Sequence, residues 1–224
     1  MKHIKPYKIF ENASPNFPTT RDEVIEVCKK YDIENYTIND DLSIDVAGGV
    51  NLAYKNLEHL PLKFNYVSGN FLCRINKLKS LEGCPRTVNG SFFCNDNELK
   101  TLEGSPQTIG GDFLCYENEL KSFEGSPQTV GGGFYCADNE LRDLEYFPEV
   151  DGSTNMRENP VNLLLYTFIY LPEANNFLIE YFNDYEIIRN RDTVMLDRLQ
   201  TFIRDNNLKM PDLDEIKKHY KIIE

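Results

Sequence analysis

The sequence lacks the features of several protein classes. Its 24 basic residues are outnumbered by 36 acidic ones, giving a net charge of −12, whereas proteins that bind nucleic-acid backbones or anionic lipid need a basic face. The longest apolar run, 163–171, is interrupted by Thr167 and is too short to span a bilayer. No apolar stretch of the signal-peptide kind follows the charged N-terminus. We therefore expect a cytoplasmic protein that binds neither nucleic acid nor membrane.

Metal-binding and catalytic motifs are missing as well. The three histidines, His3, His59 and His219, share no spacing and no Cys-x-x-Cys occurs, so we expect no metal site and no cofactor. The sequence has no Gly-x-Ser-x-Gly, no Gly-Lys-Ser/Thr loop and no His-Glu-x-x-His. The glycines at 131–133 resemble a phosphate loop, but glycine recurs at this position of the repeat described next. We name no catalytic residue and expect that the protein is not an enzyme.

A repeat of 21 residues is the strongest pattern in the sequence. Each copy has an aromatic-x-cysteine pair, an asparagine three residues after the cysteine, a leucine two residues further on, and then a Leu/Phe-Glu-x-x-Pro segment. The aromatic-x-cysteine pairs are Phe71/Cys73, Phe92/Cys94, Phe113/Cys115 and Phe134/Cys136. Weaker copies at 46–57 and 150–161 extend the array to about six coils, and degenerate end copies are typical of capping units.

The repeat predicts a stack of short strands. An aromatic-x-cysteine pair places two side chains on one face of a strand, and strands of successive coils would lie about 4.8 Å apart in a parallel sheet. We interpret the four cysteines as small core residues, with pairwise disulfides in their column as the alternative. The asparagine would satisfy main-chain groups where the chain leaves the strand. Proline would fix an extended back to each coil.

This pattern resembles a known repeat family. The motif Val-x-Gly-x-Phe-x-Cys-x-x-Asn-x-Leu-x-x-Leu-Glu-Gly-x-Pro is similar to the short bacterial leucine-rich repeat, with one extra residue between proline and strand in most coils. It most resembles uncharacterised leucine-rich-repeat proteins encoded by bacteriophages and some bacteria. The resemblance covers roughly residues 20–204 and implies architecture, with no activity to carry over. For a phage protein, it implies action in the host cytoplasm, such as inhibition or sequestration of a host factor.

We therefore predict an α/β solenoid, a leucine-rich repeat of about six coils with a parallel sheet on the concave face. Residues 1–19 would be a flexible lead-in, 20–43 an N-terminal cap of one helix and a hairpin, 44–161 the solenoid and 162–224 an all-helical C-terminal cap. The helix would begin at the capping box Thr20-x-x-Glu23. A separate effector domain in the tail is the alternative to a cap. The C-terminal helices are expected at about 162–170, 173–182, 192–205 and 212–220.

The concave sheet face is the predicted partner site. Side chains between the two inward positions of each strand point outward, and in four adjacent coils they are large and apolar. We name these four residues, Leu72, Phe93, Leu114 and Tyr135, the apolar stripe. A contiguous apolar patch with a polar rim is typical of a protein-binding surface. We predict a protein partner; a homodimer through this face, or coverage by the lead-in or tail, are the alternatives. The flanking binding residues would be Arg74, Asn95, Asp112 and Tyr116.

Charged columns along the array support a second hypothesis. Two glutamate columns and one basic column have the period of the repeat. They are Glu82, Glu103, Glu124 and Glu145; Glu98, Glu119 and Glu140; and Lys79, Lys100, Lys121 and Arg142. A solvated face with offset charges is the ordinary interpretation, and an acidic decoy that mimics nucleic acid is the functional one. A third hypothesis, a small enzyme in the tail, would need a cluster among Tyr181, Tyr185, Glu186 and Asp192.

Overall fold

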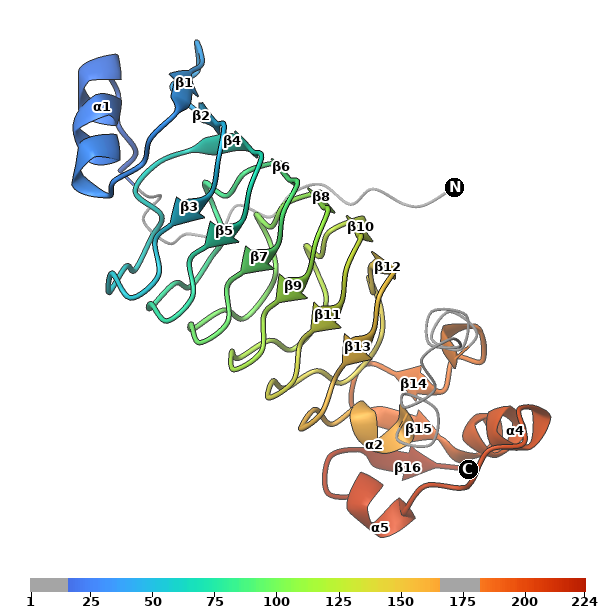
Figure 1. Ribbon diagram of the computed structural model, residues 1–224. Coiled ribbons are helices and arrows are strands. Elements are labelled where there is room, and N and C mark those ends of the chain that lie inside the picture. The colour runs from blue at the N-terminus through green and yellow to red at the C-terminus, as the bar shows by residue number, and fades with distance from the viewer. Residues whose placement is uncertain (1–15, 166–181) are drawn as a thin grey trace.

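The computed structural model describes residues 16–165 and 182–224. They form a solenoid in which short parallel strands of successive coils stack on one another, so the prediction of a solenoid is confirmed (Figure 1). The helix α1 (Arg21–Lys30) stands at one end of the stack, and a small unit of helices and strands follows the last coil (Figure 1). No helix in the described ranges combines the length and the apolar composition needed to cross a bilayer.

The coils build two sheets rather than the single sheet that the repeat predicts. Sheet A consists of β1 (Tyr36–Ile38), β2 (Ile44–Val46), β4 (Phe64–Val67), β6 (Thr87–Val88), β8 (Thr108–Ile109), β10 (Thr129–Val130) and β12 (Glu149–Val150). Sheet B consists of β3 (Val50–Asn51), β5 (Phe71–Leu72), β7 (Phe92–Phe93), β9 (Phe113–Leu114), β11 (Phe134–Tyr135) and β13 (Thr154–Asn155). All pairings are parallel except that of β1 with β2. Sheet A uses the back of each coil, where we predicted only extended chain.

Columns of equivalent side chains fill the interior between the two sheets. In sheet B the phenylalanine rings stack, with centroids 5.5 Å apart for Phe71 and Phe92 and 5.1 Å apart for Phe113 and Phe134. The cysteines of the same strands are fully buried, and all six cysteines are free thiols. Burying each large apolar side chain stabilises the fold by roughly 1.5–3 kcal/mol. Sheet A contributes Val67, Val88, Ile109, Val130 and Val150 to the core.

An asparagine closes the turn after every strand of sheet B except β3. The Asn118 amide donates to the carbonyl oxygens of Cys115 in its own coil and Cys94 in the preceding coil, at 3.1 Å each. Its side-chain oxygen accepts a hydrogen bond of 3.0 Å from the amide N–H of Leu99. Main-chain groups that would otherwise be buried unpaired are thereby satisfied, as the sequence predicts. The same contacts recur at Asn76, Asn97, Asn139 and Asn159.

Glycine is required at two corners of the coil. At Gly90, a Cβ would lie only 2.7 Å from the carbonyl carbon of Gly69 in the preceding coil, so the coils can stack at this corner only without side chains. Gly104 has a φ of 85°, a left-handed conformation that side chains disfavour. These two glycines set the close spacing that brings the strands into register.

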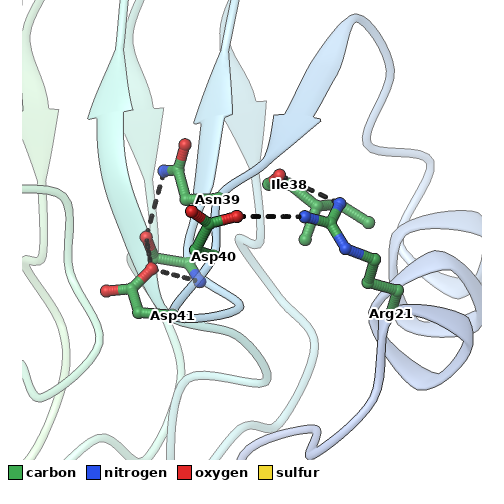
Figure 2. A network of polar contacts seen from close by, with 6 residues as sticks. Arg21, Ile38, Asn39, Asp40 and Asp41 are labelled. Carbon is green, nitrogen blue, oxygen red and sulfur yellow. Dashed lines mark hydrogen bonds and ion pairs between the residues drawn. The ribbon is translucent and has the colours of Figure 1, made fainter.

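The N-terminal unit is tied together by polar contacts around one hairpin. The Thr20 hydroxyl accepts from the Glu23 N–H at 3.2 Å, and the Glu23 carboxylate accepts from the Thr19 N–H at 2.7 Å. Arg21 donates to the carbonyl of Ile38 at 3.1 Å and lies 3.7 Å from the Asp40 carboxylate (Figure 2). These contacts attach α1 to the β1–β2 hairpin, and Val24 and Cys28 of α1 are buried in the solenoid core.

The predicted flexible lead-in is described only from residue 16 onward. There Phe17 packs against the solenoid at Gly83. Its ring lies so close that a Cβ added to this glycine would be only 2.9 Å away. The Lys63 Nζ stands 5.4 Å from the centre of the same ring. This end of the lead-in is therefore part of the packed structure.

The C-terminal unit corrects the prediction of an all-helical cap. It contains a three-stranded sheet of β14 (Ile188–Arg189), β15 (Thr193–Met195) and β16 (Lys221–Ile223). The β-branched residues of β15 form a strand where we predicted the start of a helix at 192, because they pair with both neighbouring strands. The predicted helix 173–182 and the end of 162–170 lie outside the described residues except for Phe182. The helices with both ends inside the described residues are α2 (Asn162–Leu165), α4 (Leu196–Asp205) and α5 (Leu213–Ile216).

The C-terminal unit contacts the solenoid around Arg142. The Arg142 guanidinium donates to the carbonyl of His219 at 2.5 Å and stands 5.9 Å from the Tyr220 ring. The Tyr220 hydroxyl in turn donates to the carbonyl of Arg142 at 2.8 Å, and burial raises the pKa of this tyrosine. Arg142 is the one member of the basic column that is not lysine, and this contact gives a physical reason for the change.

Candidate partner-binding face

The predicted apolar stripe is present as a continuous row on sheet B. Parallel pairing places Leu72 beside Phe93, Phe93 beside Leu114 and Leu114 beside Tyr135. The residues on either side of them in each strand, such as Phe113 and Cys115, point inward and are fully buried. The four stripe residues are themselves half-buried at the outer surface. The strand register therefore gives the stripe the outward orientation that the repeat predicts.

The flanking residues differ in how far they reach the surface. Arg74 lies against the stripe, with its guanidinium carbon 6.0 Å from the Phe93 ring and 5.9 Å from the Tyr54 ring. The Asp112 carboxylate accepts a hydrogen bond of 2.7 Å from the Gly133 N–H. Asn95 is only 1% exposed and donates to Asp96 at 2.5 Å, so it supports this surface from beneath instead of offering a contact.

A shallow hollow lies over the stripe. It has a volume of about 480 Å³ and is lined by Phe93, Leu114 and Tyr135 of the stripe, together with Tyr116 and Ala137. Desolvation is the main reason that the pKa of Tyr116 is raised, and the nearby Asp96 carboxylate adds to the effect. The structure thus brings five of the eight predicted site residues into one concave feature: Phe93, Asp112, Leu114, Tyr116 and Tyr135.

The rim of the hollow contains carboxylates that the sequence prediction missed. We name Asp96, Glu117 and Asp138 the rim column; each follows the strand cysteine by two residues and has a φ between 53° and 56°. Glu117 and Asp138 line the hollow directly. The pKa of Glu117 is raised, chiefly through its hydrogen bond with Asp96 and the charge of that group. The 21-residue period could have revealed this column, but its position beside the stripe depends on the left-handed turn.

The charged columns of the second hypothesis are cross-linked from coil to coil. Lys79 lies 3.8 Å from Glu98, and Lys100 lies 3.7 Å from Glu119 in the next coil. A third pair, Lys121 with Glu140, has a distance of 3.4 Å. These exposed pairs match the interpretation of a solvated face, in which each contributes at most about 1 kcal/mol.

The tail residues named for the third hypothesis have separate partners. The Tyr185 hydroxyl donates to Asp205 at 3.0 Å, and Glu186 forms an ion pair of 2.5 Å with Arg198. Asp192 accepts from the Thr193 hydroxyl, and Tyr181 lies outside the described residues. A second hollow of about 480 Å³ borders Glu186 but not Tyr185 or Asp192. The described residues therefore do not form the predicted cluster.

Comparisons with known proteins do not relate the chain to a characterised family. No protein-family model matches the chain, and neither the curated proteins nor the solved structures include a significant match.

Proposed function

We propose that this protein is an interaction module of the leucine-rich-repeat type that binds a protein partner through the apolar stripe of sheet B. The observation that carries the proposal is the register that aligns Leu72, Phe93, Leu114 and Tyr135 on adjacent strands at outward positions. A sheet face that meets only water gains nothing from four large apolar side chains, whereas binding energy concentrates in such central anchors. Cytoplasmic location is part of the proposal.

The resemblance to phage-encoded repeat proteins extends this proposal. We propose that the partner is a host factor that the protein inhibits or sequesters. The six buried free thiols are compatible with a reducing compartment. The acidic decoy receives less support, because the glutamates Glu98, Glu119 and Glu140 each lie beside a lysine of the preceding coil.

The test compares capture of one partner by matched variants. The tagged full chain is used to capture proteins from the organism in which it acts, and the captured proteins are quantified by mass spectrometry. The stripe variant Phe93→Ser/Leu114→Ser removes apolar area at the surface, so we expect the partner signal to fall by more than tenfold. The control Glu103→Gln/Glu124→Gln changes a glutamate column and should leave the signal unchanged.

The outcomes separate the alternatives. Loss of the partner with the control but not with the stripe variant would contradict the proposal and favour the decoy. Raising the salt concentration gives an independent readout, since decoy binding should weaken steeply and stripe binding only slightly. If light scattering shows that the wild type is a dimer and the stripe variant a monomer, the partner is a second copy of this chain.

A further inference from the structure

The hollow on sheet B combines aromatic rings with carboxylates. Phe93, Tyr116 and Tyr135 supply the rings. Asp112 lines the hollow where the chain enters β9, and Glu117 lines it just after the same strand ends. The face of an aromatic ring attracts a cation, and carboxylates at both ends of the strand strengthen that attraction. The chemistry of the hollow therefore suits a guanidinium or ammonium group.

One small residue opens the hollow. The outward positions two residues beyond the stripe hold Arg74, Asn95, Tyr116 and Ala137 in successive coils. Ala137 has only a methyl group there, and it forms part of the lining next to Tyr116 and Tyr135. The space beside these two rings is thus left for a side chain that none of the described residues supplies.

Arg74 shows how a cation is held on this face. Its guanidinium stands 6.0 Å from the Phe93 ring, within the range of a cation–π contact. The hollow lies further along the same row, where Ala137 replaces arginine at the equivalent position. An external arginine or lysine would meet the Tyr116 and Tyr135 rings as Arg74 meets Phe93.

The rim column supplies uncompensated negative charge. Among the described residues, none of Asp96, Glu117 and Asp138 forms an ion pair with a basic side chain. Their coils stack at the strand spacing of about 4.8 Å, so like charges lie close together. The raised pKa of Glu117 reflects this proximity to Asp96 and Asp138. A cation placed over the column would relieve the repulsion.

We propose that the occupant of this face is an extended basic segment of a protein partner, whose arginine or lysine enters the hollow while its apolar side chains lie on the stripe. This inference rests on the proposed function and specifies its partner. A basic ligand is complementary in charge to this face, because the rim column and the net charge of −12 both favour a cation. An extended chain advances about 3.3 Å per residue, so about four or five residues cross the four strands of the stripe.

The test selects peptides against the full-length protein. The probe is a display library of random peptides of about ten residues, enough to cross the stripe with some excess. We expect the selected sequences to combine arginine or lysine with apolar residues. The best peptide is then compared with a copy in which citrulline, an uncharged isostere, replaces each arginine. Three charge contacts at the rim should make the arginine form bind about tenfold more tightly.

Two variants divide the binding energy between rim and stripe. The rim variant Asp96→Asn/Glu117→Gln/Asp138→Asn removes charge with little change in shape, and asparagine tolerates the left-handed conformation. It should bind the arginine peptide less tightly than the wild type does, so the difference between the arginine and citrulline peptides should shrink to what Asp112 and the rings contribute. The stripe variant Phe93→Ser/Leu114→Ser should lose both peptides. Circular dichroism melting confirms that each variant is folded.

Each contrary result has a distinct meaning. Selection of neutral or acidic peptides, or equal binding of the two peptide forms by the wild type, would overturn the basic segment and leave the stripe as a binding surface. Absence of any enriched peptide would also overturn the basic segment, and the capture experiment would still decide the proposed function. Peptides that bind the stripe variant normally would contradict both inferences.

Discussion

The two sheets of the solenoid share one core but present different outer faces. In sheet A the outward residues of neighbouring coils are Thr87, Thr108 and Thr129, which lie beside one another in parallel register. The corresponding row in sheet B is Phe93, Leu114 and Tyr135. Both rows occupy strands of two residues with the same period, so the fold imposes the same constraints on each.

The difference shows what the fold requires and what it leaves open. The inward positions of both sheets are apolar except for Thr154 in the last strand of sheet B, because burying an unpaired polar group is costly. The outward positions accommodate threonine in three neighbouring strands of sheet A. Large apolar residues on sheet B therefore have no structural requirement behind them. The threonine row serves as an internal reference for an ordinary solvated sheet face.

The largest effect should come from placing a charge on the inner side of one strand of sheet B. We expect Phe113→Asp to unfold the array, with a loss of more than about 4 kcal/mol, because the carboxylate would be buried without a partner. Urea denaturation followed by circular dichroism measures this loss in the free energy of unfolding. The neighbouring Leu114→Ser should cost less than about 1 kcal/mol. Equal costs at the two positions would mean that the strand register is wrong.

Raising the pH should destabilise the core through the buried cysteines of sheet B, because sheet A has no ionisable side chain in its inward column. Burial raises the pKa of Cys94, Cys115 and Cys136, whereas the inward column of sheet A consists of valine and isoleucine. An unfolded cysteine titrates near pH 8.5, so the stabilising contribution is intact below about pH 8.5 and is lost as the pH rises beyond it. At about pH 9.5, one unit higher, we expect the free energy of unfolding to fall by up to about 1.4 kcal/mol for each buried thiol.

Denaturation at pH 7.5 and 9.5 under reducing conditions tests this dependence. Cys115→Ala serves as the matched variant, since it removes one thiol from the column. It lowers stability at both pH values but should show a smaller difference between them. A pH dependence identical to that of the wild type would show that the column does not resist ionisation.

An intermediate effect is expected at the turns. Asn118→Asp keeps an acceptor for the Leu99 N–H but loses the amide that donates to Cys94 and Cys115. Leaving these carbonyls unpaired should cost about 3 kcal/mol in the free energy of unfolding. The matched change at the edge of sheet A is Asn89→Ala, which removes one exposed hydrogen bond of 2.7 Å to Tyr66. It should cost less than about 1 kcal/mol, and a larger loss would mean that both edges depend on such contacts.

The smallest effect concerns the threonine row. Thr87→Ala/Thr108→Ala should lower stability by no more than about 1 kcal/mol, which is the span of strand propensities. Partner capture should be unchanged, in contrast to the stripe variant of similar stability. Calorimetric melting and the capture assay together measure the comparison. A drop in capture with the threonine variant would place the partner on sheet A.

Much of sheet B could be predicted from sequence, because every coil repeats its signal. Phe92, Cys94 and Asn97 have fixed spacing, and the spacing alone gives the inward face and the turn. The repeating part of sheet A was missed because each coil offers there one inward valine or isoleucine, without a pair of inward residues of the aromatic-x-cysteine kind to mark a strand. The strand β15 was missed because its partner β16 lies far along the chain, and local periodicity contains no information on such pairing.

The candidate site was predictable to a similar degree. The row of Leu72, Phe93, Leu114 and Tyr135 follows from the period alone. The hollow does not, because it depends on how Ala137 lies relative to the Tyr116 and Tyr135 rings. Nor does the period reveal that Asn95 is buried beneath the surface, because its burial depends on the packing of neighbouring coils. The sequence thus predicted the row of the stripe, and packing determined which of the named residues lie at the surface.

The asparagine contacts have a consequence for how this protein can change in evolution. Each asparagine closes the turn of the preceding coil, as Asn97 accepts from the Leu78 N–H at 3.0 Å and Asn118 from the Leu99 N–H. Inserting or deleting a few residues would break one such link, while duplicating or removing a whole 21-residue unit would restore every link at the junction. Length should therefore change in whole coils, and each duplication would widen the outer face of sheet B by about 4.8 Å and one outward side chain.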